Sequence, residues 1–248
     1  MNLDKMVNSK WYTGFEWGYR LVFLNLLMIT IPALLGAIPF LLWRRYPNAG
    51  WLVIVAIVLM LFGFIPCFIA AFRVIKAYRE EQTGTLFGLF FTYLFNTFKN
   101  IYLLELIMLP LFCLYTVAAL FYWDIIGNYA QLDLPGWVAV ISFVVLFFAL
   151  VAFLLALIQL PMIVANFRMK TWSLLKFAFF MAFRYFFKTL TYGLLLLFPL
   201  LLVGLLKQIF LPFYLLIGIS GPLYLIYMIS RKQYWYLTHN LDELTTKE

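Results

Sequence analysis

The sequence predicts an all-α, polytopic membrane protein with six transmembrane helices, and two observations carry that prediction. Apolar residues make up 66% of the chain and charged residues 11%, whereas soluble domains have roughly 45–50% and about 25%. The charged residues also stand between six long uncharged runs, each close to or above the about 20 residues that cross a bilayer. This composition excludes a soluble enzyme, a nucleic-acid-binding module, a disordered chain and a disulfide-stabilised secreted domain.

The uncharged runs place the six helices in order along one membrane domain, residues 1–248. Their lengths are 23, 27, 18, 34, 18 and 23 residues. The third run is extended toward Lys99 because it is short for a span, and this brings Glu105 into the helix. The fourth run is longer than one span requires. The expected spans lie near residues 21–42, 50–72, 101–123, 137–160, 189–206 and 209–230.

The charges on the connecting segments predict the orientation. With the N-terminus inside, the inner segments carry 15 of the 18 Lys and Arg residues, and the outer loops carry Arg44, Arg45 and Lys207. Inner loops of membrane proteins are enriched in Lys and Arg. We therefore expect both termini in the cytoplasm. The net charge of +8 then needs no nucleic-acid partner to explain it.

Two proline-containing stretches indicate an internal repeat. Residues 66–73 read PCFIAAFR and residues 161–168 read PMIVANFR, so proline, alanine, phenylalanine and arginine coincide at an offset of 95. After each stretch the offset becomes 89, which pairs Lys99 with Lys188. We expect parallel repeats of helix pairs, related by an axis along the membrane normal. The alternative is that proline kinks and basic anchors recur in membrane helices for packing reasons alone. The expected units are residues 50–123 and 137–206.

A long aromatic stretch precedes the third and the fifth expected spans on the inner side. These stretches, residues 85–98 and 171–188, each lead directly into a helix. Lys176, Arg184 and Lys188 are spaced by eight and four residues, which places them on one side of a helix. We expect interfacial elbow helices at the level of the inner headgroups. The alternative is a docking surface for a cytosolic or membrane partner.

Nothing in the sequence supports catalysis, a cofactor or a bound metal. The one histidine, His239, lies in the polar C-terminal tail, and the chain has no metal-binding Cys/His set and no phosphate-binding glycine loop. Cys67 and Cys113 lie at different depths in their spans, so no disulfide is expected. We therefore expect a protein that is not an enzyme, with no catalytic, cofactor-binding or metal-binding residues.

Glu105 is the ionisable residue expected inside a span, about 9 Å beyond Lys99 at about 1.5 Å per residue. Its repeat partner position holds Leu194, so the acid departs from the internal symmetry. A carboxyl group in a membrane span is typical of a proton or cation step. The alternative is a structural ion pair with Arg73, Arg168 or Lys99.

The other binding candidates lie at the inner ends of the spans. Arg73 and Arg168 each end a descending helix, where they either clamp an anionic headgroup or a partner's carboxylate, or simply anchor the helix. Four polar residues near the inner halves of spans either join helices or line a cavity. These four are Asn25, Asn96, Gln159 and Asn166. The full set of candidate binding residues is Glu105, Arg73, Arg168, Lys99, Lys188 and Asn166.

Three stretches, in this order, carry a resemblance to a known family. LVFLNLLMITIPALLGAIPFLL opens the first span, AAFRVIKAYREEQTGTLFGLFFTYLFNTFKN follows the second, and NFRMKTWSLLKFAFFMAFRYFFKTL follows the fourth. Together with a length somewhat over 200 residues, they resemble the YesL-like family of bacterial integral membrane proteins, whose function is unknown. The resemblance covers residues 15–235.

The resemblance implies a bacterial plasma-membrane protein that works beside a carbohydrate import system. Family members are found with carbohydrate ABC importers, polysaccharide-degrading enzymes and sensor kinases. The implied partner is therefore a carbohydrate ABC transporter or a sensor kinase. The stretch AAFRVIKAYREEQTG lacks the acid that precedes the alanines in the coupling loop of an importer permease. The chain is not expected to be a standard permease subunit.

Two functions fit these observations. The first is a non-enzymatic accessory or assembly protein of a carbohydrate uptake or sensing system, acting through its aromatic elbows and lipid-facing helices. The alternative is an autonomous secondary transporter with a cavity at the proline-broken helices and Glu105 as coupling acid. The sequence favours the first, because the spans contain few titratable groups. The lipid bilayer is the expected surrounding in both cases, and the sequence does not set the oligomeric state.

Overall fold

The computed structural model describes residues 10–127, 136–206 and 209–245, and these residues form helices and no strand. The prediction of an all-α chain is confirmed. The helices are α2 (Lys10–Arg45), α3 (Trp51–Arg79), α4 (Leu86–Gly127), α5 (Gly136–Asn166), α6 (Thr171–Arg184), α7 (Phe186–Leu206), α8 (Leu211–Ile217) and α9 (Ser220–Thr245).

Five of the described helices, α2, α3, α4, α5 and α7, are long and apolar enough to cross a membrane. The sixth expected span, 209–230, is not a single helix. Instead, α8 and the Ser220–Thr238 part of α9 meet at a bend of 49°, and together they have the length and composition of one broken span. Pro222 lies one turn beyond Gly218 and has no N–H to donate to the Gly218 carbonyl, so a regular helix cannot continue there. The chain is a multi-pass membrane protein.

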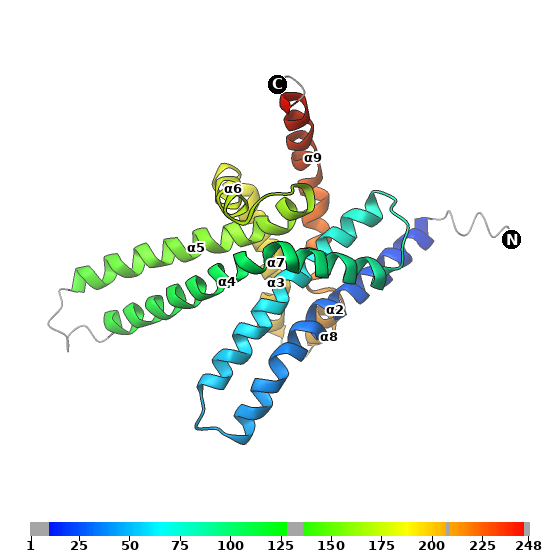
Figure 1. Cartoon of the computed structure of the whole chain (residues 1–248). Helices are drawn as coiled ribbons and strands as arrows, with labels where there is room; N and C mark the ends of the chain where they lie inside the picture. The colour runs from blue at the N-terminus through cyan, green and yellow to red at the C-terminus, as the bar shows by residue number, and fades with distance from the viewer. Residues whose placement is uncertain (1–9, 128–135, 207–208, 246–248) are drawn as a thin grey trace.

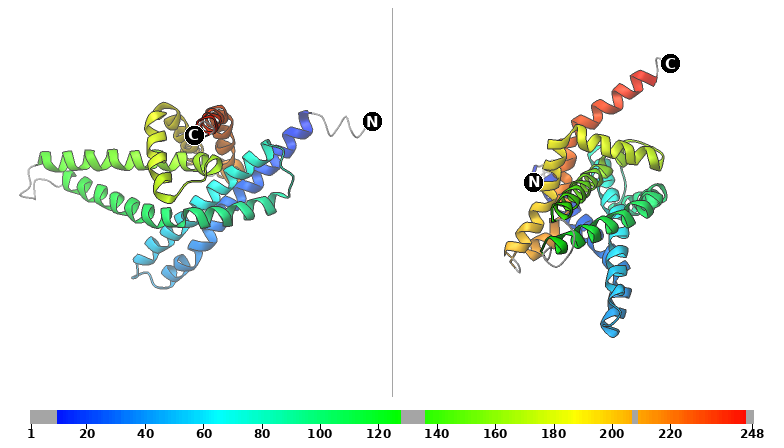
Figure 2. Two further views of the ribbon diagram at one scale, coloured as in Figure 1. Left: turned by 45° about the horizontal axis from the view of Figure 1, so that its top comes forward. Right: turned by 90° about the vertical axis from the view of Figure 1, so that its left-hand side faces the viewer.

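Two long antiparallel hairpins dominate the arrangement of the helices (Figure 1). The connecting ends of the α2–α3 and α4–α5 hairpins point in different directions in every view (Figure 2). The central helix is α3, since it packs against α2, α4, α5 and α9. Its second half is fully buried at Cys67, Ile69, Ala70 and Val74. The core of the protein therefore surrounds the proline-containing half of α3.

Glycine allows α2 and α3 to approach each other closely. A Cβ atom added to Gly36 would lie 2.5 Å from Met60 Cε, and one added to Gly63 would lie 2.5 Å from Leu35 Cδ1. A side chain at either position would force the facing Met60 or Leu35 side chain to move, so glycine permits the spacing that is present. Lipid tails are as apolar as leucine, and membrane helices therefore associate through close packing at small residues. The first hairpin is held together in this way.

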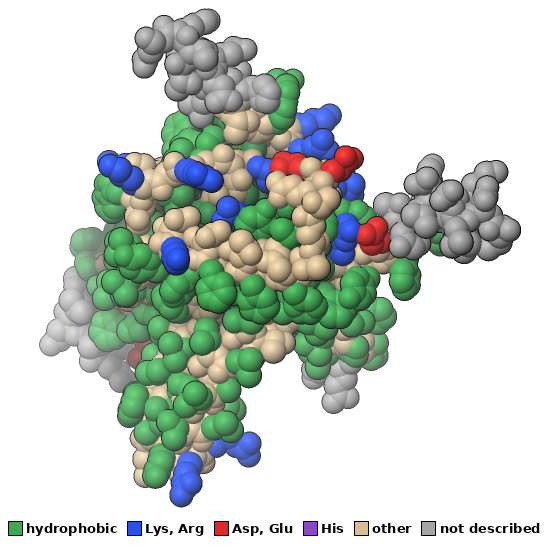
Figure 3. Space-filling view, turned by 45° about the vertical axis from the view of Figure 1, so that its right-hand side comes forward, with side chains coloured by type: hydrophobic (Ala, Val, Ile, Leu, Met, Phe, Trp, Pro, Cys, Tyr) green, Lys and Arg blue, Asp and Glu red, His purple; other side chains and the backbone are tan. Residues whose placement is uncertain are grey.

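Apolar side chains cover the outer surface of the long helices. Ile38 on α2, Val145 on α5 and Leu201 on α7 are 69%, 62% and 58% exposed. Figure 3 shows wide hydrophobic areas between Lys and Arg side chains gathered toward the upper end and another basic group at the tip of the α2–α3 hairpin. That group is Arg44 and Arg45 in the last turn of α2; the expected outer Lys207 lies outside the described residues. A surface of this kind is suited to contact with lipid.

The two aromatic stretches differ from each other, and one differs from its prediction. Residues 171–184 form a separate helix, α6, and Tyr185 is its C-terminal cap. Residues 85–98 do not form a separate elbow helix, because α4 continues from Leu86 through the third span without a break. The Thr189 hydroxyl lies 3.4 Å from the carbonyl of Ala182 and thus bridges the break between α6 and α7. In the first stretch the buried hydroxyl, Thr97, instead accepts a hydrogen bond from Arg73, and the helix runs on.

Candidate functional site

Glu105 lies on α4 and is buried, with 1% of its surface exposed. Neither carboxylate oxygen has a hydrogen-bond partner among the described residues. No ion pair in the described part of the chain includes it, so the alternative of a structural pair with Arg73, Arg168 or Lys99 does not form. Burying an acid without partners costs free energy. Glu105 therefore makes no identified contribution to helix packing and stays a candidate for function.

Arg73 joins α3 to the first turns of α4. Its Nη1 donates to Thr97 Oγ1 at 3.2 Å, and its guanidinium lies over the Tyr93 ring, 4.7 Å from the ring centroid. Arg168 is exposed in the segment between α5 and α6. Arg73 is thus engaged in packing α3 against α4. Of the proposed arginine clamp, only Arg168 makes no hydrogen bond to the described residues.

Lys76, a residue outside the predicted candidates, joins α3 to the end of α5. Its Nζ donates to the carbonyl of Ala165 at 3.0 Å and to Asn166 Oδ1 at 2.8 Å. Asn166 in turn donates to the Met162 carbonyl at 2.7 Å. The predicted candidate Asn166 therefore binds a lysine of the neighbouring span. The available signal in the sequence was spacing, since Lys76 lies one helical turn after Arg73.

Asn25 on α2 satisfies the backbone at the break between α8 and α9. Its Nδ2 donates to the carbonyls of Tyr214 and Leu215 at 2.9 and 2.8 Å. Its Oδ1 accepts hydrogen bonds from the N–H groups of Ile219 and Ser220 at 2.8 and 2.9 Å. The first N–H groups of a helix have no partner within the helix, so Asn25 acts as the cap of α9 from a different helix. This buried amide joins helices.

Gln159, Thr189 and Tyr234 form a buried hydrogen-bond network across α5, α7 and α9. Gln159 Nε2 donates to Thr189 Oγ1 at 2.6 Å, and the Tyr234 hydroxyl donates to Gln159 Oε1 at 2.8 Å. Hydrogen bonds of this kind stabilise contacts between membrane helices. Gln159 therefore joins helices as well, whereas Asn96 is exposed on α4.

The two lysines that the repeat pairs, Lys99 and Lys188, are both exposed. Lys188 Nζ donates to Gln233 Oε1 at 3.3 Å and lies 5.5 Å from the centroid of the Tyr185 ring. Lys99 has no comparable contact among the described residues. No hydrogen bond or ion pair joins either lysine to another of the predicted binding residues, so these lysines do not extend the site.

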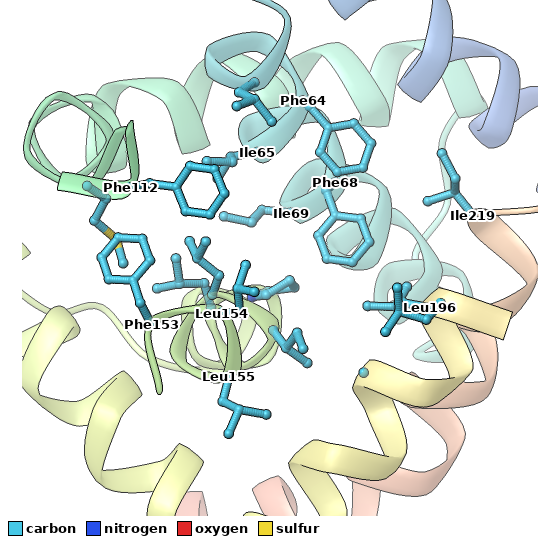
Figure 4. Close-up of a pocket in the computed structure, with 18 of the residues that line it drawn as sticks. Phe64, Ile65, Phe68, Ile69, Phe112, Phe153, Leu154, Leu155, Leu196 and Ile219 are labelled. Atoms are coloured by element: carbon cyan, nitrogen blue, oxygen red, sulfur yellow. The ribbon is translucent and has the colours of Figure 1, made fainter. Parts of the chain in front are cut away.

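A cavity of about 540 Å³ lies between α3, α4, α5, α7 and α8, and its lining is almost wholly apolar. The rings of Phe64, Phe68 and Phe112 face it (Figure 4). Pro161 is part of the lining, so the cavity lies at one of the proline positions, as the transporter alternative expects. Glu105 is not part of the lining. The cavity therefore offers space for apolar groups without a titratable group.

A second cavity, of about 300 Å³, lies between α3, α5 and α9 and has a charged lining. Lys76 contributes to it from α3, Glu80 from the cap of α3, and Arg231 from α9. Within residues 10–127, 136–206 and 209–245, no group of three or more His, Cys, Asp or Glu residues is arranged to hold a metal ion. Cys67 and Cys113 are free thiols. The charged cavity is thus the described site with the most polar chemistry.

Comparison with known proteins gives no match: no family model, no curated protein and no solved structure matches the chain. The resemblance to the YesL-like family therefore stays a prediction. The candidate functional features rest on geometry alone, and they are the unpartnered Glu105, the apolar cavity and the charged cavity.

Proposed function

We propose that the chain is a non-enzymatic accessory or assembly protein of a bacterial plasma membrane, acting in a carbohydrate uptake or sensing system. One observation carries the proposal. The buried amides of the spans bind other helices, while the large cavity between those helices is apolar. The interior is therefore suited to holding the helices together, and partners would bind at the exposed surfaces.

A route for a sugar or an ion needs polar groups that replace the water around the solute. Moving a hydroxyl or amide group out of water without new hydrogen bonds costs roughly 2–7 kcal/mol. The 540 Å³ cavity offers almost no such partners. Asn25 and Gln159 already use their amide groups to hold α7, α8 and α9. The interior therefore favours a structural role over the transport of hydrophilic solutes.

The exposed aromatic side chains of the two inner stretches are the proposed contact surface, which we name the aromatic elbows. On α4 they recur every three or four residues and so share one helix face. Large aromatic side chains dominate protein interfaces, because they bury much area at a small entropic cost. The exposed members are Phe87, Phe91, Phe95 and Phe98 in the first elbow and Trp172, Phe180, Phe183, Phe186 and Phe187 in the second.

The proposed orientation has both termini in the cytoplasm. It rests on the Lys and Arg residues, which gather at one end of the helices and are sparse at the other. In this orientation the aromatic elbows face the cytoplasmic side of the membrane. The proposed partner, a carbohydrate ABC transporter or a sensor kinase, follows from the YesL-like resemblance.

The test is photocrosslinking in native membranes, with a crosslinking amino acid at single positions and mass spectrometry of the products after purification in mild detergent. Phe95 in the first elbow and Phe148 on α5 are matched, since they are 64% and 66% exposed. We expect a discrete product with one membrane protein from Phe95 and from Phe187, and none from Phe148. Products with lipid alone at every position would contradict the accessory role.

An autonomous secondary transporter is the second candidate, and one observation favours it: Glu105 is buried and has no partner among the described residues. If Glu105 is a coupling acid, Glu105→Gln abolishes carbohydrate flux into proteoliposomes. If the protein is an accessory component, the variant keeps its crosslinked partner and reconstituted protein shows no flux before or after the change. The two functions therefore differ in the flux of the unchanged protein, and in whether Glu105→Gln removes a flux or leaves a crosslinked partner in place.

A further inference from the structure

The charged cavity between α3, α5 and α9 has no role in the proposed accessory function. It measures about 300 Å³. On the α3 side, the lining residues are Phe72 and Lys76, which are four residues apart and share one helix face, and Glu80, the residue that caps the end of α3. The end of α5 contributes Asn166. The lining residues of α9 are Tyr227, Ser230, Arg231, Tyr234, Trp235 and Thr238.

Arg231 is the cation of this cavity without a protein partner. It is exposed, and it makes no hydrogen bond, ion pair or ring contact with a described residue. Other arginines at the same end of the molecule are engaged: Arg20 pairs with Glu16, and Arg79 lies 4.6 Å from the centroid of the Trp17 ring. The planar guanidinium carries five N–H donors. Those of Arg231 are available to a ligand in the cavity.

Lys76 supplies a second cation from the opposite wall. Two of its three ammonium hydrogens bond to the Ala165 carbonyl and to Asn166 Oδ1. Lys76 also forms an ion pair with Glu80, at 3.8 Å between Nζ and Oε1, which is longer than a hydrogen bond. Asn166 donates one amide hydrogen to the Met162 carbonyl. Its second amide hydrogen makes no hydrogen bond to a described residue. A ligand with several acceptor oxygens would gain donors from both walls.

The position of the cavity along the helices indicates where such a ligand comes from. Lys76 lies in the last turn of α3, at the basic end of the span. Tyr227 and Trp235 stand beside the charges, and Tyr and Trp are enriched where membrane helices meet the headgroups. A volume of about 300 Å³ is at the lower limit of small-molecule pockets, which span roughly 300–1,000 Å³. It has room for a headgroup, while acyl chains stay in the surrounding lipid.

We propose that this cavity binds the phosphate group of a membrane lipid between Arg231 and Lys76. Arginine holds phosphate through two parallel N–H bonds, and lysine adds a compact charge. Asn166 donates a further hydrogen bond. The Glu80 carboxylate opposes binding, because it repels the phosphate and competes for Lys76. The proposal does not depend on the accessory function, and either can fail alone.

The test uses the full chain in a neutral detergent and counts bound lipid by native mass spectrometry. The probes are phosphatidylglycerol and a diacylglycerol with the same acyl chains, which lacks only the phosphate headgroup. We expect Arg231→Gln to weaken phosphatidylglycerol binding by about tenfold, as for the loss of a charged hydrogen bond. Lys232→Gln is the matched control: it removes the same charge at an exposed neighbour that does not line the cavity, and should change binding less than about twofold.

A second pair of variants separates ligand binding from damage to the fold. Glu80→Gln is expected to tighten phosphatidylglycerol binding by about threefold, because the opposing carboxylate is lost. Glu81→Gln removes the next, equally exposed acid, which is not part of the lining, and should leave binding unchanged. A misfolded variant cannot bind its ligand more tightly, so a gain with Glu80→Gln alone supports the site.

The source of the phosphate is tested with sn-glycerol 3-phosphate, a soluble headgroup without chains. Displacement of phosphatidylglycerol by this compound supports the phosphate site, with the lipid as its source. Binding of the soluble compound without binding of the lipid would overturn the lipid assignment. Equal binding of the diacylglycerol, or equal losses with Arg231→Gln and Lys232→Gln, would overturn the site itself.

Discussion

The first half of the chain consists of uninterrupted helices, whereas the second half consists mostly of interrupted ones. The helices α2, α3 and α4 have 36, 29 and 42 residues, while α6, α7 and α8 have 14, 21 and 7. Buried polar side chains follow the interruptions. Thr189 stands beside the α6–α7 break, and Asn25 holds the α8–α9 break. At these two breaks, a buried hydroxyl and a buried amide satisfy backbone groups that have no partner within a helix.

The two expected repeat units also differ in their interiors at aligned positions, in one case in each direction. Gln159, the centre of the buried network, corresponds to Phe64 in the first unit. Leu194 is 57% exposed, and its counterpart Glu105 is 1% exposed. The shared proline and arginine pattern therefore does not impose the same interior. The repeat itself stays a prediction, and the differences between its units are where the chemistry lies.

The largest effect is expected at the α8–α9 break. Asn25→Leu leaves the Leu215 carbonyl and the N–H groups of Ile219 and Ser220 without this partner, at roughly 1–3 kcal/mol for each buried group; the Tyr214 carbonyl keeps its bond from the Gly218 N–H. We expect a loss of folded protein, or the largest fall in the midpoint of thermal unfolding in detergent, followed by tryptophan fluorescence. Asn96→Leu, on the uninterrupted α4, is the control and should unfold as the unchanged protein does. Equal losses would break the link between polar burial and interruption.

The network at the α6–α7 break gives the next effect. Gln159→Leu should lower the free energy of unfolding by about 1–3 kcal/mol, because the Tyr234 hydroxyl loses its acceptor. Adding Tyr234→Phe removes the orphaned hydroxyl, so the double variant should be more stable than Gln159→Leu alone. Chemical unfolding of the single and double variants measures this coupling. If the losses of free energy from the two single variants simply add in the double variant, the three side chains do not act as one network.

An effect of opposite sign is expected in the uninterrupted half. Glu105→Leu introduces the residue of the aligned position, and should raise the free energy of unfolding by about 1 kcal/mol, because a buried unpartnered acid is replaced by an apolar side chain. Leu194→Glu, the reciprocal change, places an acid on an exposed apolar face and should lower the yield of inserted protein. Thermal unfolding and membrane yield are the measurements. A destabilised Glu105→Leu variant would show that the carboxyl group stabilises the fold.

The smallest effects are expected at the paired lysines. Lys99→Gln and Lys188→Gln remove exposed charges, and each should change the free energy of unfolding by less than about 0.5 kcal/mol. The hydrogen bond from Lys188 to Gln233 makes the second change the larger of the two. The same unfolding measurement compares them. A large loss in the free energy of unfolding with Lys188→Gln alone would mean that Lys188 helps to hold the interrupted helices together.

Much of the fold was predictable, because the bilayer sets both the length and the composition of a span. The charged residues that bound the uncharged runs therefore located five helices and the region of the sixth. The break in the sixth span was not predicted. It depends on hydrogen bonds to the amide of Asn25, which lies 194 positions before Ile219 in the sequence. The continuous α4 was also missed, because aromatic composition fits an elbow and a span equally well.

The candidate site was predicted only in part. Asn25, Gln159 and Asn166 stood out as polar residues in apolar segments, but the same residue types join helices and line cavities. Their role depends on partners that only the packing brings within 3 Å. Lys76 was missed because a lysine in the last turn of a span is ordinary. Its contact with Asn166 exists only because α3 and α5 end side by side.

The bond between the first span and the last has a consequence for synthesis. Asn25 and the groups it binds are 189 to 195 positions apart. At about 5–20 residues per second, roughly 10–40 s pass between their entries into the membrane. Throughout that interval the amide lacks these partners, and a lipid environment penalises an unsatisfied amide. The bond between α2 and the α8–α9 break can therefore close only after α9 has entered the membrane.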